Sequence, residues 1–246
     1  MSRKYGNDPI VEAVCEFRLM PDSEWDLTIP GLVYEKVRSD FPNKEQRIIQ
    51  EVELTQSSQG IQQNTRTRER AIFLTNDRKM FIQVGPHLLA ISCLKPYPTW
   101  EGFKPWIEKA FNALAHTVDV KVLQRIGLRY VNRIEIGGKP VKLEDYFEFY
   151  PFLGQNLPQD MLNFNMVCVL PFFDGRDSCR VQLTNAVPDE FGNIVILLDL
   201  DYFLSQPLAF LANQALEWVD SAHQEVEDIF EGCLAERLRE IFREVK

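Results

Sequence analysis

Three arginines recur along one apolar stretch in the middle of the chain. The segment QRIGLRYVNRIEI, residues 124–136, places Arg125, Arg129 and Arg133 at intervals of four. Alternate residues of an extended strand share a face, so the three guanidiniums are expected on one side and apolar side chains on the other. A guanidinium can donate two parallel hydrogen bonds to a carboxylate or a phosphate. The sequence therefore predicts an arginine-lined sheet face at which Arg125, Arg129 and Arg133 contact an anionic small molecule or a nucleotide.

The same arginines have acidic partners available inside the chain. Glu12 and Glu16 recur in another alternating segment. Cross-strand neighbours of opposite charge stabilise a sheet, whereas like charges side by side are unfavourable. Because of this rule, we favour pairing of the arginines with Glu12, Glu16 or other strand carboxylates over an open anion site. The anion site needs an open cavity over this face, and a structure in which every guanidinium is bonded to a carboxylate and no pocket is present would remove it.

A second group of basic residues lies in a polar run, residues 57–70. Arg66, Arg68 and Arg70 occur there, and Ile61 is the only core-type residue of the run. This composition favours a loop or a hairpin tip, which either contacts an acidic partner or forms a solvated face. Nucleic acid is expected at most through this basic loop, because the net charge is -9 and no aromatic residues interleave with the arginines.

The last part of the chain has helical periodicity. Apolar or small residues recur in steps of three and four between positions 206 and 244, as along a helix seam. A continuous helix of that length would span roughly 58 Å, which exceeds the diameter of about 46 Å expected for a compact chain of this size. We therefore expect the helix to overhang or to break near Gly232. The residues predicted to dock a protein partner are Trp218, Glu225, Phe230 and Leu234.

Two acidic groups have the spacing of metal ligands. Asp220, His223 and Glu227 are three and four residues apart and can share a helix face. A solvated acidic face explains them better, since no second ligand pair has matching spacing. Asp199 and Asp201 likewise fit cap or turn residues better than a metal pair. With no glycine-rich phosphate loop, GxSxG or HExxH motif, the sequence predicts no catalytic residue, metal or cofactor, and enzyme activity is the less favoured interpretation.

Composition and termini indicate a globular protein of the cytoplasm. The apolar fraction is 45%, and the amino terminus MSRKYGNDPI lacks the apolar run of a signal peptide. No stretch approaches the ~20 apolar residues that cross a bilayer, so no membrane association is expected. The cysteines stand singly without a CxxC pair, and we expect all of them to be buried thiols of a reducing compartment. They are Cys15, Cys93, Cys168, Cys179 and Cys233.

These side chains would be positioned by strands that alternate with a few helices. Apolar alternation predicts strands at 11–19, 46–54, 71–75, 80–84, 88–94, 121–136, 164–170, 178–186 and 193–201. Helical spacing predicts helices at 31–41, 99–117 and 143–149 before the terminal one. The expected fold is α+β, a largely antiparallel curved sheet with helices packed on one face. It forms one compact unit, 1–246, from two similar halves, 1–120 and 121–246.

Several segments resemble an uncharacterised family of sporadically distributed prokaryotic proteins of about this length. They are PIVEAVCEFRL, LKPYPTWEGFKP and RIGLRYVNRI. The resemblance covers nearly the whole chain and implies an accessory role beside a prokaryotic defence system, such as a CRISPR-associated one, or within a mobile-element operon. It implies no catalytic residue or cofactor.

Two functions remain in view from the sequence. The first is a non-enzymatic binding or regulatory protein that docks a protein partner through the terminal helix or an exposed sheet edge. The second is a sensor or enzyme for an anionic small molecule or nucleotide at the arginine-lined sheet face. The sequence leaves the oligomeric state open.

Overall fold

The computed structural model describes residues 4–57, 60–138, 141–159, 161–207 and 211–245. Within them the chain is an α+β protein built on an open, curved, antiparallel sheet of nine strands in the order β3-β4-β5-β6-β2-β7-β10-β9-β8. The predicted fold class is confirmed. Among the described residues, no helix has the length and apolar character needed to cross a membrane.

The elements follow the predicted order, except that the helix predicted at 143–149 is only a three-residue 3-10 turn. The strands of the large sheet are β2 (Ile10–Leu19), β3 (Asn43–Ser57), β4 (Gly60–Leu74), β5 (Met80–Gly85), β6 (Leu88–Leu94), β7 (Leu123–Ile136), β8 (Asn165–Phe172), β9 (Asp177–Ala186) and β10 (Ile194–Leu204). The helices are α1 (Ile29–Val37), α2 (Trp100–Ala115), α3 (Ala215–Cys233) and α4 (Glu236–Phe242). Short 3-10 turns lie at η1 (Leu143–Asp145), η2 (Phe173–Gly175) and η3 (Ala212–Gln214). A separate ribbon pairs β1 (Lys4–Tyr5) with β11 (Glu244–Val245).

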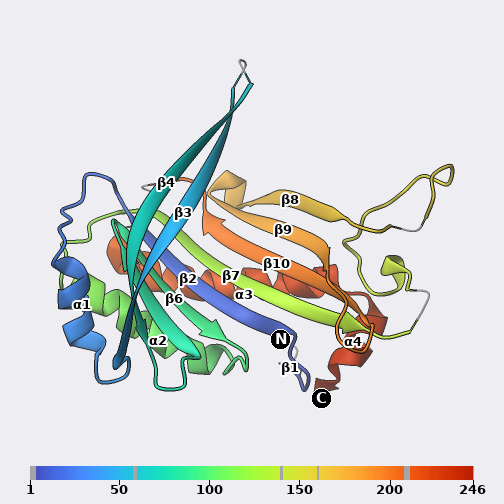
Figure 1. Cartoon of the computed structure of the whole chain (residues 1–246), viewed down its shortest axis with the longest axis horizontal. Coiled ribbons are helices and arrows are strands. Elements are labelled where there is room, and N and C mark those ends of the chain that lie inside the picture. Colours follow the sequence, from blue (N-terminus) through green and yellow to red (C-terminus); the bar gives the residue numbers. More distant parts are fainter. Residues whose placement is uncertain (1–3, 58–59, 139–140, 160, 208–210, 246) are drawn as a thin grey trace.

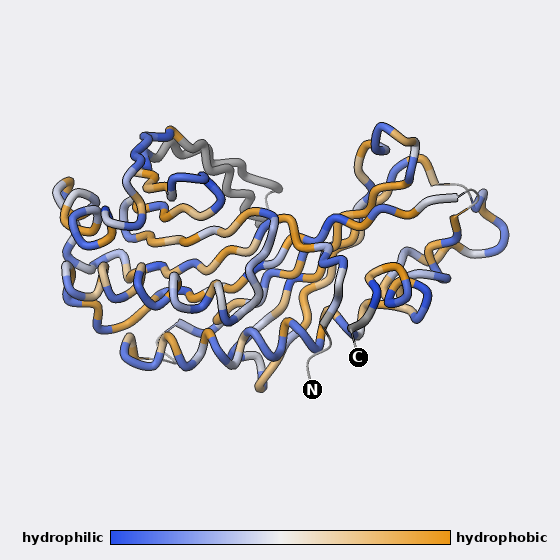
Figure 2. The backbone as a smooth tube through the Cα atoms, turned by 90° about the horizontal axis from the view of Figure 1, so that it is seen from below, coloured by the Kyte–Doolittle hydropathy of each residue, from blue (hydrophilic) through white to orange (hydrophobic). Residues whose placement is uncertain are grey.

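The helices cover one face of the sheet and leave the other open. Figure 1 shows α2 and α3 behind the sheet, and Figure 2 shows the helices and the sheet as successive layers. Alternation explains this arrangement, because the residues of β2 that face the helices, Ala13, Cys15, Phe17 and Leu19, are all buried. Phe17 packs on Phe111 of α2 with ring centroids 4.6 Å apart. The core therefore lies between the sheet and its helices.

The strand order is similar on the two sides of the central pair β2 and β7. On one side β6, β5 and β4 follow β2 outward, and on the other β10, β9 and β8 follow β7. A long helix comes next in the chain after β6 and again after β10, namely α2 and α3. The core contains side chains from both halves of the sequence. A shared ancestry of the two halves stays a prediction.

The terminal helix is broken near the predicted place. Helix α3 ends at Cys233, Leu234 is extended with ψ 130°, and α4 begins at Glu236. Leu238 and Phe242 of α4 are buried in the core. The break folds the end of the chain back onto the protein, so α4 does not overhang.

Residues 57–70 are predicted as a loop or a hairpin tip, and the loop alternative is wrong where the structure describes them. Strand β4 pairs along its whole length with β3, from Asn43 opposite Leu74 to Ser57 opposite Gly60. Figure 1 shows the two strands continuing together beyond the rest of the sheet. This strand has few apolar residues, so it lacks the alternation that identifies a half-buried strand.

The prediction that all five thiols are buried is wrong for one of them. Cys168 is exposed, because it lies on the edge strand β8, most of whose residues are accessible to solvent. Burial raises the pKa of Cys93 to about 11 and the pKa of Cys179 and Cys233 to about 12. Burial also raises the pKa of Cys15. These four thiols are therefore protected from reagents by packing and by a low thiolate fraction.

Native protein is expected to react with a thiol reagent such as DTNB at one fast site. Cys168 is the only exposed cysteine, and reagents attack accessible thiolates. Cys168→Ser should abolish the fast phase, and adding urea should release the remaining thiols. A fast phase of more than one thiol in the folded protein would contradict the burial of the other four.

Candidate functional site

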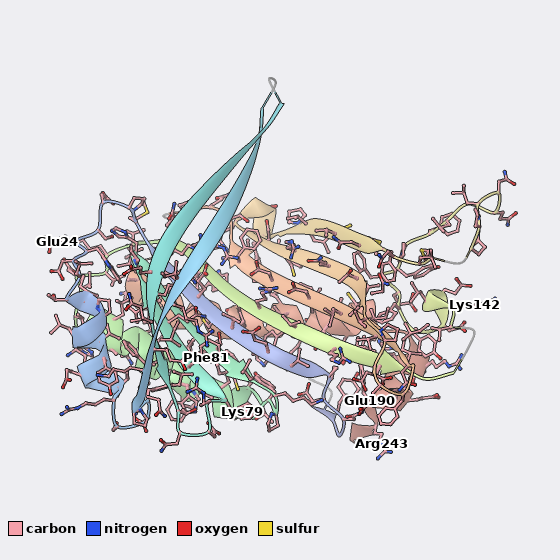
Figure 3. All side chains as sticks on the ribbon, in the orientation of Figure 1. Glu24, Lys79, Phe81, Lys142, Glu190 and Arg243 are labelled. Atoms are coloured by element: carbon pink, nitrogen blue, oxygen red, sulfur yellow. The ribbon has the colours of Figure 1, made fainter. Side chains whose placement is uncertain are left out.

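The arginines on the open face of the sheet form hydrogen-bonded ion pairs with carboxylates of the chain. Arg125 bonds to both oxygens of Asp201 at 3.0 and 2.9 Å and to Glu16 at 2.8 Å. Arg129 bonds to both oxygens of Asp199 at 2.8 and 2.7 Å. Figure 3 shows nitrogen and oxygen atoms along this face of β7 and β10.

The last of the three arginines is also paired. Arg133 bonds to Glu135 on its own strand at 3.0 Å. The anion site at Arg125, Arg129 and Arg133 stays a prediction, which these ion pairs disfavour because each guanidinium already has a carboxylate partner. The favoured alternative was cross-strand pairing, and it holds for Arg125 and Arg129. Asp199 and Asp201, considered as a metal pair or as cap residues, lie inside β10 and serve as ion-pair partners.

Glu16 depends on its arginine partners to remain charged. Burial alone would raise its pKa, but the charges and hydrogen bonds of Arg125 and Arg18 outweigh burial and hold the pKa below the ordinary 4.5. A carboxyl whose folded pKa is depressed stabilises the fold at neutral pH and loses this contribution as the pH falls through the folded pKa.

Glu16→Gln is expected to lower the free energy of unfolding by about 1 kcal/mol at pH 7, because hydrogen bonds to charged groups are lost. The difference from wild type should shrink as the pH falls below 4.5, where Glu16 itself becomes protonated. Urea unfolding of wild type and Glu16→Gln at several pH values measures this difference in the free energy of unfolding. A difference that is constant between pH 7 and pH 3 would show that the charge of Glu16 does not stabilise the fold.

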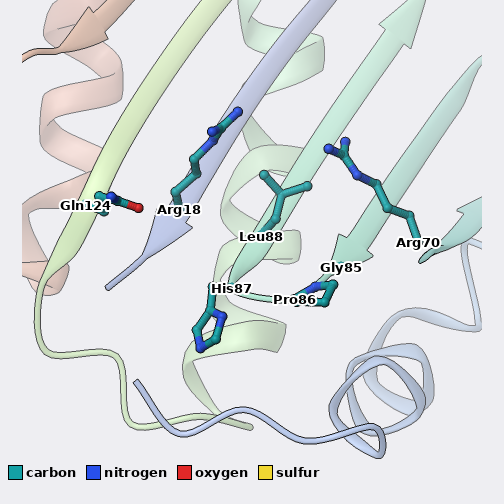
Figure 4. Close-up of a pocket in the computed structure, with 7 residues that line it drawn as sticks. All are labelled: Arg18, Arg70, Gly85, Pro86, His87, Leu88 and Gln124. Atoms are coloured by element: carbon teal, nitrogen blue, oxygen red, sulfur yellow. The ribbon is translucent and has the colours of Figure 1, made fainter. Parts of the chain in front are cut away.

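A small pocket lies at one end of the open face. Figure 4 shows Arg18 on β2 and Arg70 on β4 on either side of Leu88, above the turn that contains His87. The pocket has a volume of about 80 Å³, enough for a few water molecules. Arg18 bonds to Glu16 at 2.7 Å. The pocket is too small for a nucleotide.

The basic residues predicted to form a loop belong to strand β4. Arg66 is opposite Glu51, Arg68 opposite Ile49 and Arg70 opposite Arg47 in the register with β3. The side chains of Arg66 and Arg68 lie outside the described part of the structure, so a partner contact through them stays a prediction. Arg70 lines the small pocket and does not lie in a loop.

Two of the residues predicted to dock a partner are core residues. Trp218 is 2% exposed and Leu234 is 1% exposed, so a partner cannot reach their side chains. Their spacing matched a helix seam because α3 packs that seam against the sheet. Phe230 and Glu225 are half-buried. The prediction of a docking surface through Trp218 and Leu234 is corrected accordingly.

A partly open cavity lies on the helix side of the sheet. It has a volume of about 510 Å³ and is lined by the entry to α2, the later turns of α3, the segment from β1 to β2, and strands β7 and β10. Helix α2 comes from the first half of the chain and α3 from the second. This volume is within the range of small-molecule sites.

Aromatic side chains form much of the cavity wall. Trp100 stacks on His223, with ring centroids 4.1 Å apart and an angle of 16° between the planes. The Tyr130 hydroxyl lies 3.2 Å from the Tyr97 hydroxyl and 3.3 Å from Nδ1 of His223. Nε2 of His223 lies 3.2 Å from Glu227. Burial raises the pKa of Tyr97 and Tyr130, so both phenols stay protonated at neutral pH.

The side-chain amide of Asn132 lines the cavity, and one of its polar atoms has no hydrogen-bond partner in the described part of the chain. Asn132 is 1% exposed, and its Nδ2 donates to the Leu198 carbonyl at 3.1 Å. Its Oδ1 has no hydrogen-bond partner among the described residues. Because Asn132 lines the cavity, this oxygen is suited to accept from a donor on a ligand or from a water molecule there.

One residue of the cavity wall, Thr99, has a strained backbone conformation. Thr99 has φ 69° and ψ 171°, a region that is occupied essentially by glycine and costs of order 1–3 kcal/mol. Thr99 occupies the position before helix α2. Its hydroxyl donates to Glu101 at 2.7 Å and makes no capping bond to the helix backbone. Strain of this kind concentrates at functional sites.

One carboxylate of the cavity wall lacks a charged partner. Asp8 is half-buried, and its Oδ1 accepts from the Ile10 backbone N–H at 2.8 Å. Asp8 forms no ion pair with any described residue. Burial raises the pKa of Asp8, while the Ile10 N–H and the more distant charge of Lys95 lower it in part.

The helix residues considered as metal ligands are divided between two contacts. Asp220 bonds to Lys104 of α2 at 2.8 Å, whereas His223 pairs with Glu227 and Tyr130 inside the cavity. In the described ranges, no cluster of three His, Cys, Asp or Glu side chains is arranged to hold a metal ion. His223 and Glu227 therefore contribute to the cavity wall.

The cavity is suited to binding a small molecule. It combines aromatic surface with a few polar groups that can orient a ligand: Asp8, Tyr97, Tyr130, Asn132 and His223. This is the composition of a binding site.

The fold and the cavity together define an α+β protein with an open antiparallel sheet and a ligand-sized cavity beneath its helices. Comparison with known protein families finds none that matches the chain, and no curated protein sequence matches it. The resemblance of the segments quoted above to a sporadically distributed prokaryotic family therefore stays a prediction.

Proposed function

We propose that the protein binds a small organic molecule in the cavity between α2, α3 and the sheet. The observation that carries the proposal is the unused acceptor Oδ1 of Asn132 in a cavity of about 510 Å³. The stacked pair of Trp100 and His223 supplies flat apolar surface beside it. Such a pairing of apolar walls with few polar groups is typical of ligand sites.

A cavity-filling variant tests the proposal. Val226 of α3 lines the cavity and is 3% exposed. Val226→Phe places a larger side chain into the space that a ligand would use. A fragment collection screened by saturation-transfer NMR should yield fragments that bind wild type and lose at least tenfold in affinity, about 1.4 kcal/mol, with the variant.

The control for this experiment is to check that the Val226→Phe protein is folded. The circular dichroism spectrum and melting temperature of Val226→Phe should stay close to those of wild type, because the new ring enters empty space. If a collection of diverse fragments contains none that distinguishes wild type from a folded Val226→Phe protein, the proposed function is wrong.

Protein binding through the sheet edge is a second candidate function. Strand β8 pairs with β9 alone among the described strands, which leaves its outer backbone groups available. Val167, Val169 and Leu170 are 43%, 58% and 41% exposed, and β8 contains no charged residue. Natural edge strands usually carry charges that oppose pairing. A second copy of the chain, with its β8 antiparallel to the first, fits this edge because no like charges would meet.

The oligomeric state tests the second candidate. Wild type is expected to be a dimer at micromolar concentration in size-exclusion chromatography with light scattering. Val169→Lys should be a monomer, since it places two lysines near the centre of the pairing. Val187→Lys, which changes an exposed residue outside β8, should remain dimeric. A wild-type monomer at high concentration would contradict pairing through β8.

A further inference from the structure

The cavity has a chemical preference that follows from its unsatisfied groups. This inference rests on the proposed function, since it names the class of molecule that the cavity binds. Asp8 and Asn132 both present acceptor oxygens that have no donor among the described residues. A ligand that supplies hydrogen-bond donors or positive charge would satisfy them, whereas an anionic ligand would meet a carboxylate.

The two acceptors lie in the same part of the fold. In the register of β2 and β7, Ile10 is the partner of Asn132, and Asp8 precedes Ile10 by two residues. The backbone N–H of Arg133 donates to the Pro9 carbonyl at 2.9 Å, which fixes this segment against β7. The half-buried carboxylate and the amide oxygen are therefore held by backbone pairing at one end of the cavity.

Aromatic rings line the same cavity as these acceptors. Tyr97, Trp100 and Tyr130 line the cavity. Tyr97 meets Tyr130 edge to face, with centroids 5.7 Å apart. The negative face of an aromatic ring attracts a cation, and this attraction reaches about 2 kcal/mol when the cation is desolvated. The rings thus favour the same sign of charge as the carboxylate.

The described cavity wall supplies no cation of its own. Its lining includes no lysine or arginine, and Lys95 acts on Asp8 only through its charge at a distance. A half-buried carboxylate without an ion-pair partner is costly unless a ligand or water compensates it. From the carboxylate, the amide oxygen and the rings together, we infer that the cavity binds an organic cation, a protonated amine or a quaternary ammonium compound.

The test compares cations with neutral molecules of similar shape. The probe pairs are choline with 3,3-dimethylbutan-1-ol, 2-phenylethylammonium with 2-phenylethanol, and 1,5-diaminopentane with pentane-1,5-diol, all titrated into the full chain by calorimetry. In at least one pair the cation should bind tenfold or more tightly than its neutral partner, which corresponds to about 1.4 kcal/mol. Val226→Phe should weaken that binding.

Asp8→Asn is the diagnostic variant. The amide keeps an oxygen that can accept from the Ile10 N–H, so the local turn is preserved while the charge is removed. The ratio of the cation's affinity to that of its neutral partner should fall to near one. The affinity of the neutral partner itself should change little. Asp22→Asn is the matched control, because Asp22 is exposed and does not line the cavity, and it should leave the preference within about twofold because solvent screens an exposed charge.

The outcomes separate this inference from the proposed function. If neutral partners bind as tightly as the cations in every pair, or if no cation binds, the preference for cations is wrong. Fragments that still distinguish wild type from Val226→Phe would then leave ligand binding intact. A cation preference that survives Asp8→Asn would overturn the role of Asp8. If neither fragments nor cations distinguish the cavity-filled variant, both claims fail.

Discussion

A chain that ends at Glu231 is expected to lose most of its free energy of unfolding. The deletion removes Leu234, Leu238 and Phe242, which are 1%, 0% and 3% exposed. Each buried apolar side chain of this size contributes roughly 1.5–3 kcal/mol, so the total loss is about 5 kcal/mol or more, comparable with the whole stability of a typical domain of about 5–15 kcal/mol.

Backbone contacts add to this loss. The Glu148 N–H donates to the Cys233 carbonyl and the Ala235 N–H to the Tyr146 carbonyl, both at 2.9 Å. Truncation therefore removes backbone partners of the segment around η1 as well as the buried side chains of α4. Urea unfolding followed by circular dichroism measures the effect, with Glu240→Ala, an exposed change on α4, as the control. A truncated protein with the wild-type unfolding midpoint would show that the end of the chain is a separate appendage.

Asp177→Ala is expected to lower the free energy of unfolding by about 4 kcal/mol. Asp177 is 1% exposed and accepts from Trp218 Nε1 at 3.1 Å and from the Tyr202 hydroxyl at 3.2 Å. Both donors are themselves buried. Each buried donor left without an acceptor costs about 1–3 kcal/mol, and the loss of the bond to Arg176 adds to this cost.

Two further variants make this prediction specific. Asp177→Asn keeps the size and one acceptor oxygen, so it should lose less than Asp177→Ala. Asp174→Asn changes an exposed carboxylate nearby in the sequence and keeps a residue type that tolerates the positive φ of 53° at this position. It should lose less than about 0.5 kcal/mol, as most surface substitutions do. Urea unfolding midpoints of the three variants measure these differences. An Asp177→Ala protein as stable as the Asp174→Asn protein would contradict the buried network.

The parts of the fold that bury one face were predictable from the sequence. Strand β2 alternates Ala13, Cys15 and Phe17 with polar residues, and α2 repeats Phe103 and Ile107 at helical spacing. These periods arise because one face packs against the core while the other meets solvent. Strand β4 over residues 60–70 was missed because backbone pairing with β3, not an apolar face, defines it.

The cavity was only partly visible in the sequence. Asn132 interrupts an apolar face of β7 between Tyr130 and Ile134, and a polar residue at a core position is a signal of a site. The three arginines on the opposite face of β7 are the stronger chemical signal in the sequence, so Asn132 was not predicted as a site residue. The partners of those arginines, Asp199 and Asp201, come from β10, and only the sheet order brings them together.

The chain reversal at Leu234 explains why the docking prediction was misdirected. Periodicity identifies which residues share a helix face, but it does not say whether that face meets a partner or the protein's own sheet. Trp218 and Leu234 meet the protein's own core. The exposed apolar residues of β8 are separated from that helix in the sequence, and only the three-dimensional arrangement identifies them as a sheet edge.

The most direct test of ligand binding in the cavity is a nitrogen-15 NMR titration that follows the tryptophan indole signals. Pools of the fragment collection are added to the labelled protein. The indole signal of Trp100, which lines the cavity, should shift with bound fragments, whereas that of Trp218, bonded to Asp177 in the core, should stay in place. If fragments bind and the Trp100 signal does not move, the ligand lies elsewhere and the central claim is wrong.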